Sequence, residues 1–219
     1  MTETRIHRHH IGETIEHCAN LFDQNKRFSL SDKVVETAIH KFHGNDTLQS
    51  VLPKVILINS FYTTQIYNTE KVARHILCTD TDRRLTSGDL SLVDDIRHGH
   101  EIIVKKSGKE RDLYSFATKY AALHQPTNFP IFDSLVMRLL TALNKQINFC
   151  PPFTQADLRN YRRYVSVIDS LASYTGLNSF KYKRLDQGLW VLAKYYYDRS
   201  NLAEEEINSI HTDLQHYTN

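Results

Sequence analysis

The 219-residue sequence predicts an all-α protein, a compact multi-helix domain of about nine helices joined by short loops. Three observations favour this fold class. Glycine and proline are scarce, with seven and five residues, so turn signals lie far apart. Apolar residues recur at intervals of three and four along most of the chain. No segment alternates with a sustained period of two, and residues 101–106 are the one plausible short strand.

Capping residues indicate where these helices begin and end. Ser31 is a candidate N-cap for a helix that ends at Gly44, and Thr47 caps the next helix. Pro53 lies too deep for the first turn of a helix beginning at Leu48, so we expect this helix to begin later. The remaining predicted helices cover 69–78 after the cap Asn68, 89–99, 111–124, a segment following Asp133, a long helix between Thr154 and Gly176, 180–200, and a last helix from Ala203.

Apolar stripes on three of these helices predict the sides that face the core. Each stripe steps by three and four residues, as one face of an α-helix requires. The stripes are Leu113, Phe116, Ala117 and Tyr120 in the first helix, Leu158, Tyr161, Val165, Ile168 and Ala172 in the second, and Leu185, Leu189, Leu192 and Tyr196 in the third.

Composition limits the class of protein. Hydrophobic residues make up 41% and charged residues 24%, as in ordinary soluble globular domains. The three cysteines, Cys18, Cys78 and Cys150, are odd in number and far apart, which argues against a disulfide scaffold and fits a reducing cytoplasm. The N-terminus has no apolar signal region, and no apolar run approaches about 18 residues, so we expect a cytoplasmic protein without a membrane partner. One domain over 1–219 is expected, with two helical lobes flanking a cleft as the alternative arrangement.

A single carboxylate, Asp133, ends the loop that joins two apolar, helix-like runs in FATKYAALHQPTNFPIFDSLVMRLL, residues 116–140. One interpretation is a helix cap that accepts the backbone NH groups of residues 135 or 136. The other adds chemistry, because an acid held at a helix N-terminus among apolar neighbours can activate water or stabilise a developing cation. The two roles are compatible.

Basic clusters suggest contacts with phosphate groups, although a solvated charged surface is the alternative for each. The net charge of +2 is too small to decide the question. One cluster combines Arg162 and Arg163 with tyrosines, which suits phosphate contacts and base stacking. The other cluster, which comes earlier in the sequence, consists of Lys105, Lys106, Gly108, Lys109, Arg111 and Lys119.

Two further features have polar side chains of interest. Asn59 and Tyr62 belong to the polar, aromatic segment after the apolar VILI, and they either line a pocket or connect two helices. His124 ends the helix before the Asp133 loop, where a helix C-terminus stabilises a protonated histidine. Among the twelve histidines no metal-ligand spacing occurs, and no P-loop or Rossmann fingerprint is present, so neither a metal nor a cofactor is expected.

The order of these segments resembles the helix-hairpin-helix superfamily of DNA glycosylases. In that family a hairpin grips one DNA strand by its backbone, and the next helix leads to a loop that ends in a catalytic Asp after a proline and a small apolar residue. Pro130, Ile131 and Asp133 match this signature, with Phe132 as one extra residue. FATKY is most similar to the branch that excises 8-oxoguanine, and LDQGLWVLAKYY resembles a closing helix of divergent bacterial members. The resemblance spans about residues 50 to 200, with a helix-hairpin-helix-like core at 89–145.

The resemblance implies a partner, double-stranded DNA with a flipped modified base, and a catalytic role for Asp133. The lyase branch of the family carries its nucleophilic lysine at a position that falls near Asp112, where no lysine stands. A monofunctional, monomeric glycosylase without cofactor is therefore expected, active in base excision and DNA repair. It is also similar to bacterial antiphage glycosylases that remove modified phage bases. The implied base pocket comprises Asn59, Tyr62, Asp112 and Trp190, although Trp190 at helical spacing also suits a core.

Two other classes of function stay open. In a non-catalytic helical DNA-binding protein, Asp133 is only a cap, and Asn would replace it without loss. A helical small-molecule enzyme or regulatory partner would show no salt-dependent DNA binding.

Overall fold

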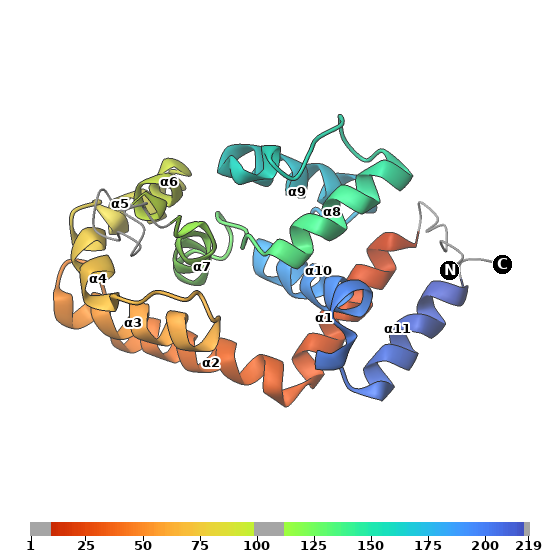
Figure 1. Ribbon diagram of the computed structural model, residues 1–219, viewed down its shortest axis with the longest axis horizontal. Helices are drawn as coiled ribbons and strands as arrows, with labels where there is room; N and C mark the ends of the chain where they lie inside the picture. The colour runs from red at the N-terminus through yellow and green to blue at the C-terminus, as the bar shows by residue number, and fades with distance from the viewer. Residues whose placement is uncertain (1–9, 99–111, 217–219) are drawn as a thin grey trace. The chain divides into compact units, whose positions relative to one another are not determined.

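The computed structural model describes residues 10–98 and 112–216 of the chain (Figure 1). These residues form eleven α-helices and two short 3-10 helices and contain no strand, which confirms the predicted all-α class. The α-helices are α1 (Ile11–Gln24), α2 (Lys26–Lys41), α3 (Leu48–Phe61), α4 (Thr69–Leu77), α5 (Thr81–Ser87), α6 (Ser91–Arg97), α7 (Tyr114–His124), α8 (Ser134–Ile147), α9 (Tyr161–Thr175), α10 (Tyr182–Tyr197) and α11 (Glu204–His216), and the 3-10 helices are η1 (Asp157–Arg159) and η2 (Arg199–Asn201).

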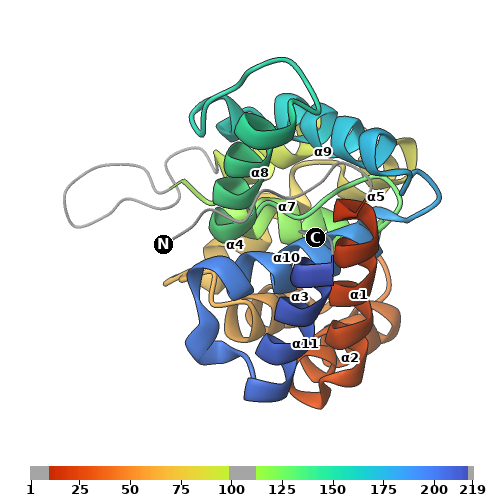
Figure 2. The same cartoon turned by 90° about the vertical axis from the view of Figure 1, so that its right-hand side faces the viewer.

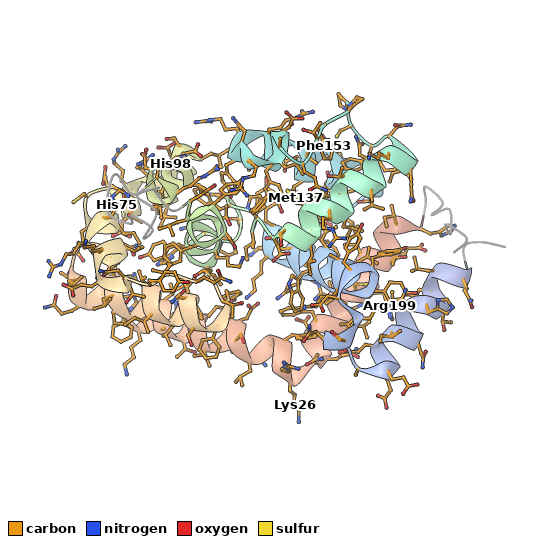
Figure 3. All side chains as sticks on the ribbon, in the orientation of Figure 1. Lys26, His75, His98, Met137, Phe153 and Arg199 are labelled. Carbon is orange, nitrogen blue, oxygen red and sulfur yellow. The ribbon has the colours of Figure 1, made fainter. Side chains whose placement is uncertain are left out.

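The chain folds into two compact units. Unit 1 combines residues 1–26 with 132–219, and unit 2 comprises residues 27–131. Side chains fill the spaces between the helices of each unit (Figure 3). Asp133 lies at the start of the second segment of unit 1. The predicted helix-hairpin-helix core at 89–145 includes residues 99–111, which lie outside the described residues.

Unit 1 is built on the close packing of α1 against α10, which lie side by side in both ribbon views (Figures 1 and 2). Gly188 makes this approach possible, because a Cβ atom there would lie 2.3 Å from the carbonyl oxygen of Ile15. α8 packs against α10, and α11 packs against α1. The first and last parts of the sequence thus share one core.

Unit 2 packs α3 against α4 and α7, and α6 against α7. α7 is the most deeply buried helix of this unit, and the predicted stripe Leu113, Phe116, Ala117 and Tyr120 is at most 3% exposed. Its hydrophobic character extends around most of its circumference, as expected of a helix with neighbours on several sides.

Several local predictions are confirmed. The side chain of Thr47 accepts the backbone NH of Ser50 and caps α3, and Asn68 caps α4 in the same way. Gly176 ends α9 with φ of 77°, a left-handed conformation that glycine adopts without strain.

Four expectations about helix boundaries and faces were wrong. Ser31 is not an N-cap, because α2 begins at Lys26 and Ser31 lies inside it. The long helix begins at Tyr161 after the cap Asn160, because Thr154 caps only the turn that contains η1. α3 begins at Leu48 and contains Pro53, so its packing compensates for the missing backbone donor. Tyr196 is 36% exposed. α1 and α5 were not predicted at all.

No described helix is both long and apolar enough to cross a membrane. All three cysteines carry free thiols. Within the described part of the chain, no group of three or more His, Cys, Asp or Glu side chains is arranged to hold a metal ion.

Candidate functional site

Asp133 is the N-cap of α8 and has an extended backbone, with φ of −131° and ψ of 141°. Its Oδ1 atom accepts the backbone NH of Leu135 at 2.8 Å and that of Val136 at 3.4 Å. Its Oδ2 atom has no hydrogen-bond partner among the described residues, and the side chain is partly exposed. The predicted cap is therefore present, and it occupies one carboxylate oxygen while leaving the other available.

The residue before Asp133 fixes the loop to the core of unit 1. Phe132 is 4% exposed, and its ring meets the edge of the Tyr164 ring at a centroid distance of 5.4 Å. The guanidinium of Arg159 lies 6.0 Å from the same Phe132 ring. The start of α8 and the start of α9 thus meet at Phe132, one residue from the carboxylate.

The two predicted DNA-binding arginines of unit 1 lie in the first turn of α9. Arg162 is exposed and makes no hydrogen bond or ion pair with the described residues. Arg163 is partly exposed and donates a 3.4 Å hydrogen bond to the carbonyl of Pro151. Both side chains therefore retain donors for a ligand in the same unit as Asp133.

Trp190, predicted in the base pocket, lies on α10 and is partly buried. Its ring packs edge-on against Phe22 at 5.9 Å, and the ammonium of Lys194 lies 4.7 Å from the ring centroid. These contacts within unit 1 are those of a core aromatic residue.

Asp112 and Lys119 lie in unit 2 and make internal contacts. Asp112 forms a two-point ion pair with Arg97, at 2.7 and 2.9 Å, and also accepts the NH of Tyr114 at the start of α7. Lys119 is 6% exposed and donates to the hydroxyl of Ser115 at 2.8 Å. The predicted phosphate contact of Lys119 thus falls on a side chain that is largely buried.

Asn59 and Tyr62 hold the connection after α3. The amide of Asn59 donates to the carbonyl of Ile66 and accepts the NH of Ile66 and the hydroxyl of Thr64. Tyr62 donates its hydroxyl to Asp32, and burial with this neighbouring charge raises the pKa of Tyr62. The polar atoms predicted for a base pocket are therefore engaged in shaping this loop.

The predicted site residues divide between the two units. Asp133, Arg162, Arg163 and Trp190 belong to unit 1, whereas Asn59, Tyr62, Asp112 and Lys119 belong to unit 2. Within unit 1 the structure brings the two arginines and Asp133 to neighbouring helix starts. The connector residues Lys105, Lys106, Gly108, Lys109 and Arg111 lie outside the described residues.

A buried polar network in unit 2 was not predicted. Lys54, 1% exposed, donates to the carbonyl of Gly44 at 2.6 Å and to the side-chain oxygen of Asn45 at 2.7 Å. The same Asn45 oxygen accepts the hydroxyl of Tyr120, and the Asn45 amide donates to Asp82 at 2.6 Å. The one signal in the sequence is a lysine in the middle of the apolar run VLPKVILI.

His124 adjoins this network and corrects the expectation of a protonated histidine. Its Nδ1 atom lies 2.7 Å from the carbonyl of Tyr120, so the neutral ring donates from Nδ1. Its Nε2 atom is buried and has no hydrogen-bond partner within the described part of the chain. Burial, with the nearby charge of Lys54, lowers the pKa of His124 to about 4. Desolvation outweighs the favourable field of the helix C-terminus.

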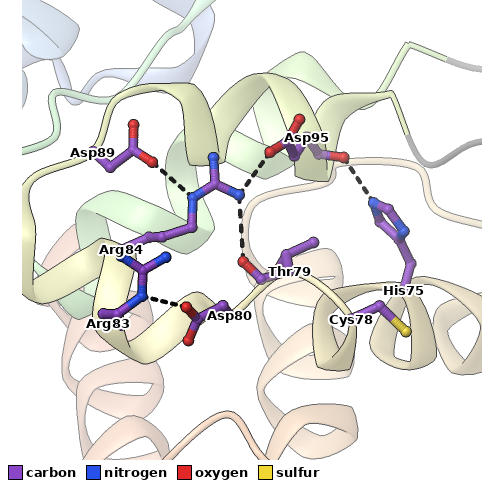
Figure 4. Close-up of a pocket in the computed structure, with 8 residues that line it drawn as sticks. All are labelled: His75, Cys78, Thr79, Asp80, Arg83, Arg84, Asp89 and Asp95. Carbon is purple, nitrogen blue, oxygen red and sulfur yellow. Dashed lines mark hydrogen bonds and ion pairs between the residues drawn. The ribbon is translucent and has the colours of Figure 1, made fainter.

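An open pocket of about 630 Å³ lies among α4, α5 and α6 of unit 2 (Figure 4). Arg84 is its central cation and donates to Asp89 at 2.8 Å and to Asp95 at 2.6 Å. Hydrogen bonds from Ser91, together with Arg84, hold the pKa of Asp89 at about 2. His75 completes the wall through a 2.7 Å contact with the carbonyl of Asp95. Arg84 thus links α5 to α6 through ion pairs, and His75 links α4 to α6 through a hydrogen bond.

A third polar constellation joins α1 to α11. The Nε2 atom of His17 lies 2.9 Å from the hydroxyl of Ser209, and its Nδ1 atom lies 3.4 Å from Asp213. The connectivity is that of a nucleophile, a base and an orienting acid. Ser209 and Asp213 lie within the body of α11, where backbone NH groups bond within the helix and cannot stabilise an oxyanion. We assign this group to helix packing.

Comparisons with known proteins place the chain in a family. The family HI_0787_N, described as an N-terminal domain, matches residues 14–128. An uncharacterized protein of Haemophilus influenzae is 38% identical over 154 residues, which cover 70% of this chain and 71% of that protein. No solved structure gives a significant match. The chain belongs to the HI_0787_N family, and the family match ends before Asp133.

Proposed function

We propose that this protein is a monofunctional DNA glycosylase that removes a damaged or modified base by hydrolysing the N-glycosidic bond. The observation that carries the proposal is the geometry of Asp133. One oxygen of its carboxylate is fixed by the backbone at the start of α8, and the other has no partner among the described residues. The resemblance of PIFDSLVMRLL to the Asp-bearing loop of helix-hairpin-helix glycosylases supports the same assignment.

The proposed chemistry follows from this fixed carboxylate. The target nucleotide leaves the base stack so that its C1′–N bond becomes accessible. This bond breaks, its electron pair leaves with the base, and the charge of Asp133 stabilises the cationic sugar. Water attacks C1′ and transfers a proton to Oδ2 of Asp133, while the departing base takes up a proton from solvent. The products are a free base and an abasic site.

The test is an excision assay on duplex DNA that carries 8-oxoguanine, uracil, alkylated or glucosylated bases, with alkali used to reveal abasic sites. Asp133→Asn keeps the cap because Asn and Asp cap helices about equally well, and it removes the charge. Asp157→Asn is the matched control, since Asp157 is an exposed acid of the same unit that caps a neighbouring turn. We expect wild type and Asp157→Asn to produce abasic sites with one of these bases, and Asp133→Asn to bind that DNA without excision.

A non-catalytic DNA-binding protein is the second candidate. The observation that favours it is the pair of hydrogen bonds that Asp133 makes as a cap, since these alone explain an acid at this position. In that case wild type and Asp133→Asn bind DNA equally, and neither yields abasic sites on any substrate of the panel.

A further inference from the structure

Three arginines lie within five residues of unit 1, beside the loop end that carries Asp133. Arg159 is the last residue of η1, and Arg162 and Arg163 are the second and third residues of α9. We call these three residues the arginine surface. Its link to Asp133 is Phe132, which contacts both Arg159 and Tyr164.

The tyrosines of this segment fix the outward direction of the arginines. Tyr161 and Tyr164 are fully buried, and their rings stack at a centroid distance of 6.4 Å. Since both tyrosines point into the core, Arg162 is left on the exposed side of the first turn. The backbone NH of Arg163 is held at 3.0 Å by the cap Asn160. The backbone that presents the arginines is therefore rigidly packed.

Among the described residues, the charges of Arg162 and Arg163 have few partners. Arg162 has no partner among the described residues, and the hydrogen bond from Arg163 to Pro151 is long at 3.4 Å. The neighbouring acid, Asp157, accepts the NH and the hydroxyl of Thr154, at 2.7 and 2.8 Å, and interacts with Arg163 through its charge without a hydrogen bond. A planar guanidinium pairs with two oxygens of a phosphate, so exposed arginines of this kind suit a phosphodiester.

We propose that the arginine surface binds a phosphodiester of the DNA strand on which Asp133 acts. That the bound strand is the one cleaved rests on the proposed function, whereas binding of DNA by these arginines does not. The start of α9 holds the backbone, and the start of α8 presents the carboxylate to a neighbouring sugar. Both groups belong to unit 1, so the packing of Phe132 against Tyr164 sets the spacing between them.

The test measures the affinity of the full chain for one duplex DNA between 50 and 200 mM salt. In B-DNA each phosphate contact contributes about 0.9 to the slope of log affinity against log salt. Arg162→Ala/Arg163→Ala should therefore lower the magnitude of this slope by about 1.8 and weaken binding most at the lowest salt concentration. Arg162→Lys/Arg163→Lys should restore most of the slope, because it keeps the charges. Arg138→Ala/Lys145→Ala, exposed cations of α8 in the same unit, is the charge-matched control and should leave the slope unchanged.

Two results would overturn the proposal: an unchanged slope in the arginine double variant, or an equal loss in the α8 control. The excision assay separates this proposal from the proposed function. In one outcome, wild type excises no base while the arginine variant still shows a smaller slope of log affinity against log salt. That result would reject the glycosylase assignment and the choice of strand, and it would support DNA binding by the arginine surface. If wild type excises a base and the arginine variant binds DNA as tightly as wild type, the proposed role of the arginine surface is rejected and the glycosylase assignment is supported. Tighter binding of duplex RNA than of DNA would also overturn the proposal.

Discussion

The ammonium of Lys54 donates a 2.7 Å hydrogen bond to the side-chain oxygen of Asn45, and both residues are almost completely buried in unit 2. Burial disfavours the charged form of Lys54, because it removes the ammonium from water. The nearby acids Asp82 and Asp46 favour the charged form, but their effect is smaller than that of burial. Burial dominates and lowers the pKa of Lys54 to about 8. The network therefore makes the stability of unit 2 depend on pH.

His124→Asn should reduce the amount by which the free energy of unfolding falls as the pH is lowered from 7 to 4. Folded His124 takes up a proton near pH 4, whereas the ordinary value is 6.5, so the unfolded chain binds more protons between these values. Stability that the neutral ring contributes is then lost as the pH falls, by up to about 3 kcal/mol. The Asn amide can still donate to Tyr120 but does not titrate. Urea unfolding of both proteins from pH 7 to pH 4 checks this, and parallel curves would contradict the prediction.

Lys54→Met should remove the increase in the free energy of unfolding that wild type shows as the pH rises above 8. Folded Lys54 loses its proton near pH 8, and the ordinary value is 10.5, so the unfolded chain again binds more protons between the two values. Wild-type stability should therefore rise relative to the variant by up to about 3 kcal/mol between pH 8 and 10.5. The difference between the two unfolding free energies isolates Lys54 from the tyrosines that titrate in the same range. A constant difference would show that Lys54 keeps an ordinary affinity for protons.

Asp133→Ala and Asp133→Asn should separate the cap from the chemistry. Ala removes the acceptor for the NH groups of Leu135 and Val136 and should cost about 1 kcal/mol of stability, whereas Asn should cost little. Both substitutions should abolish excision. Thermal unfolding and the excision assay on the same preparations give the two readouts. Excision retained by Asp133→Asn would mean that the charge of Asp133 has no chemical role.

Gly188→Ala should destabilise unit 1 by about 1 to 3 kcal/mol, because the new methyl group would overlap the backbone of Ile15 on α1. Gly176→Ala is the contrasting variant. Nothing lies within 4 Å of a Cβ at this position, so its cost is only the strain of φ at +77°, about 1 kcal/mol. Denaturant unfolding compares them. Equal or reversed losses would show that the contact between α1 and α10 tolerates a wider spacing.

Much of the fold follows from local sequence. Thr47, Asn68, Asp133 and Gly176 were each assigned to a helix end from residue type and spacing, and their structural roles match. These assignments succeed because a cap is satisfied by backbone groups only two or three residues away. The all-α class was predictable for a similar reason, since helical periodicity repeats within a few turns.

The candidate site was only partly predictable. The sequence identifies Asp133 by its place after an apolar loop and Arg162 by its charge, but not the contact of Phe132 with Tyr164 that makes them neighbours. Asn59 and Tyr62 looked available as isolated polar residues, and their hydrogen-bond partners Ile66 and Asp32 became apparent only in the folded chain.

The sequence by itself determined the helical class, several helix ends and the position of one capping carboxylate, because these depend on neighbours in the chain. Only the tertiary structure decided that Lys54 lies buried and that Pro53 is tolerated within α3. In each case packing from distant segments outweighs a local preference of about 1 to 3 kcal/mol. Burial is set by which helices meet, and no short stretch of residues encodes that information alone.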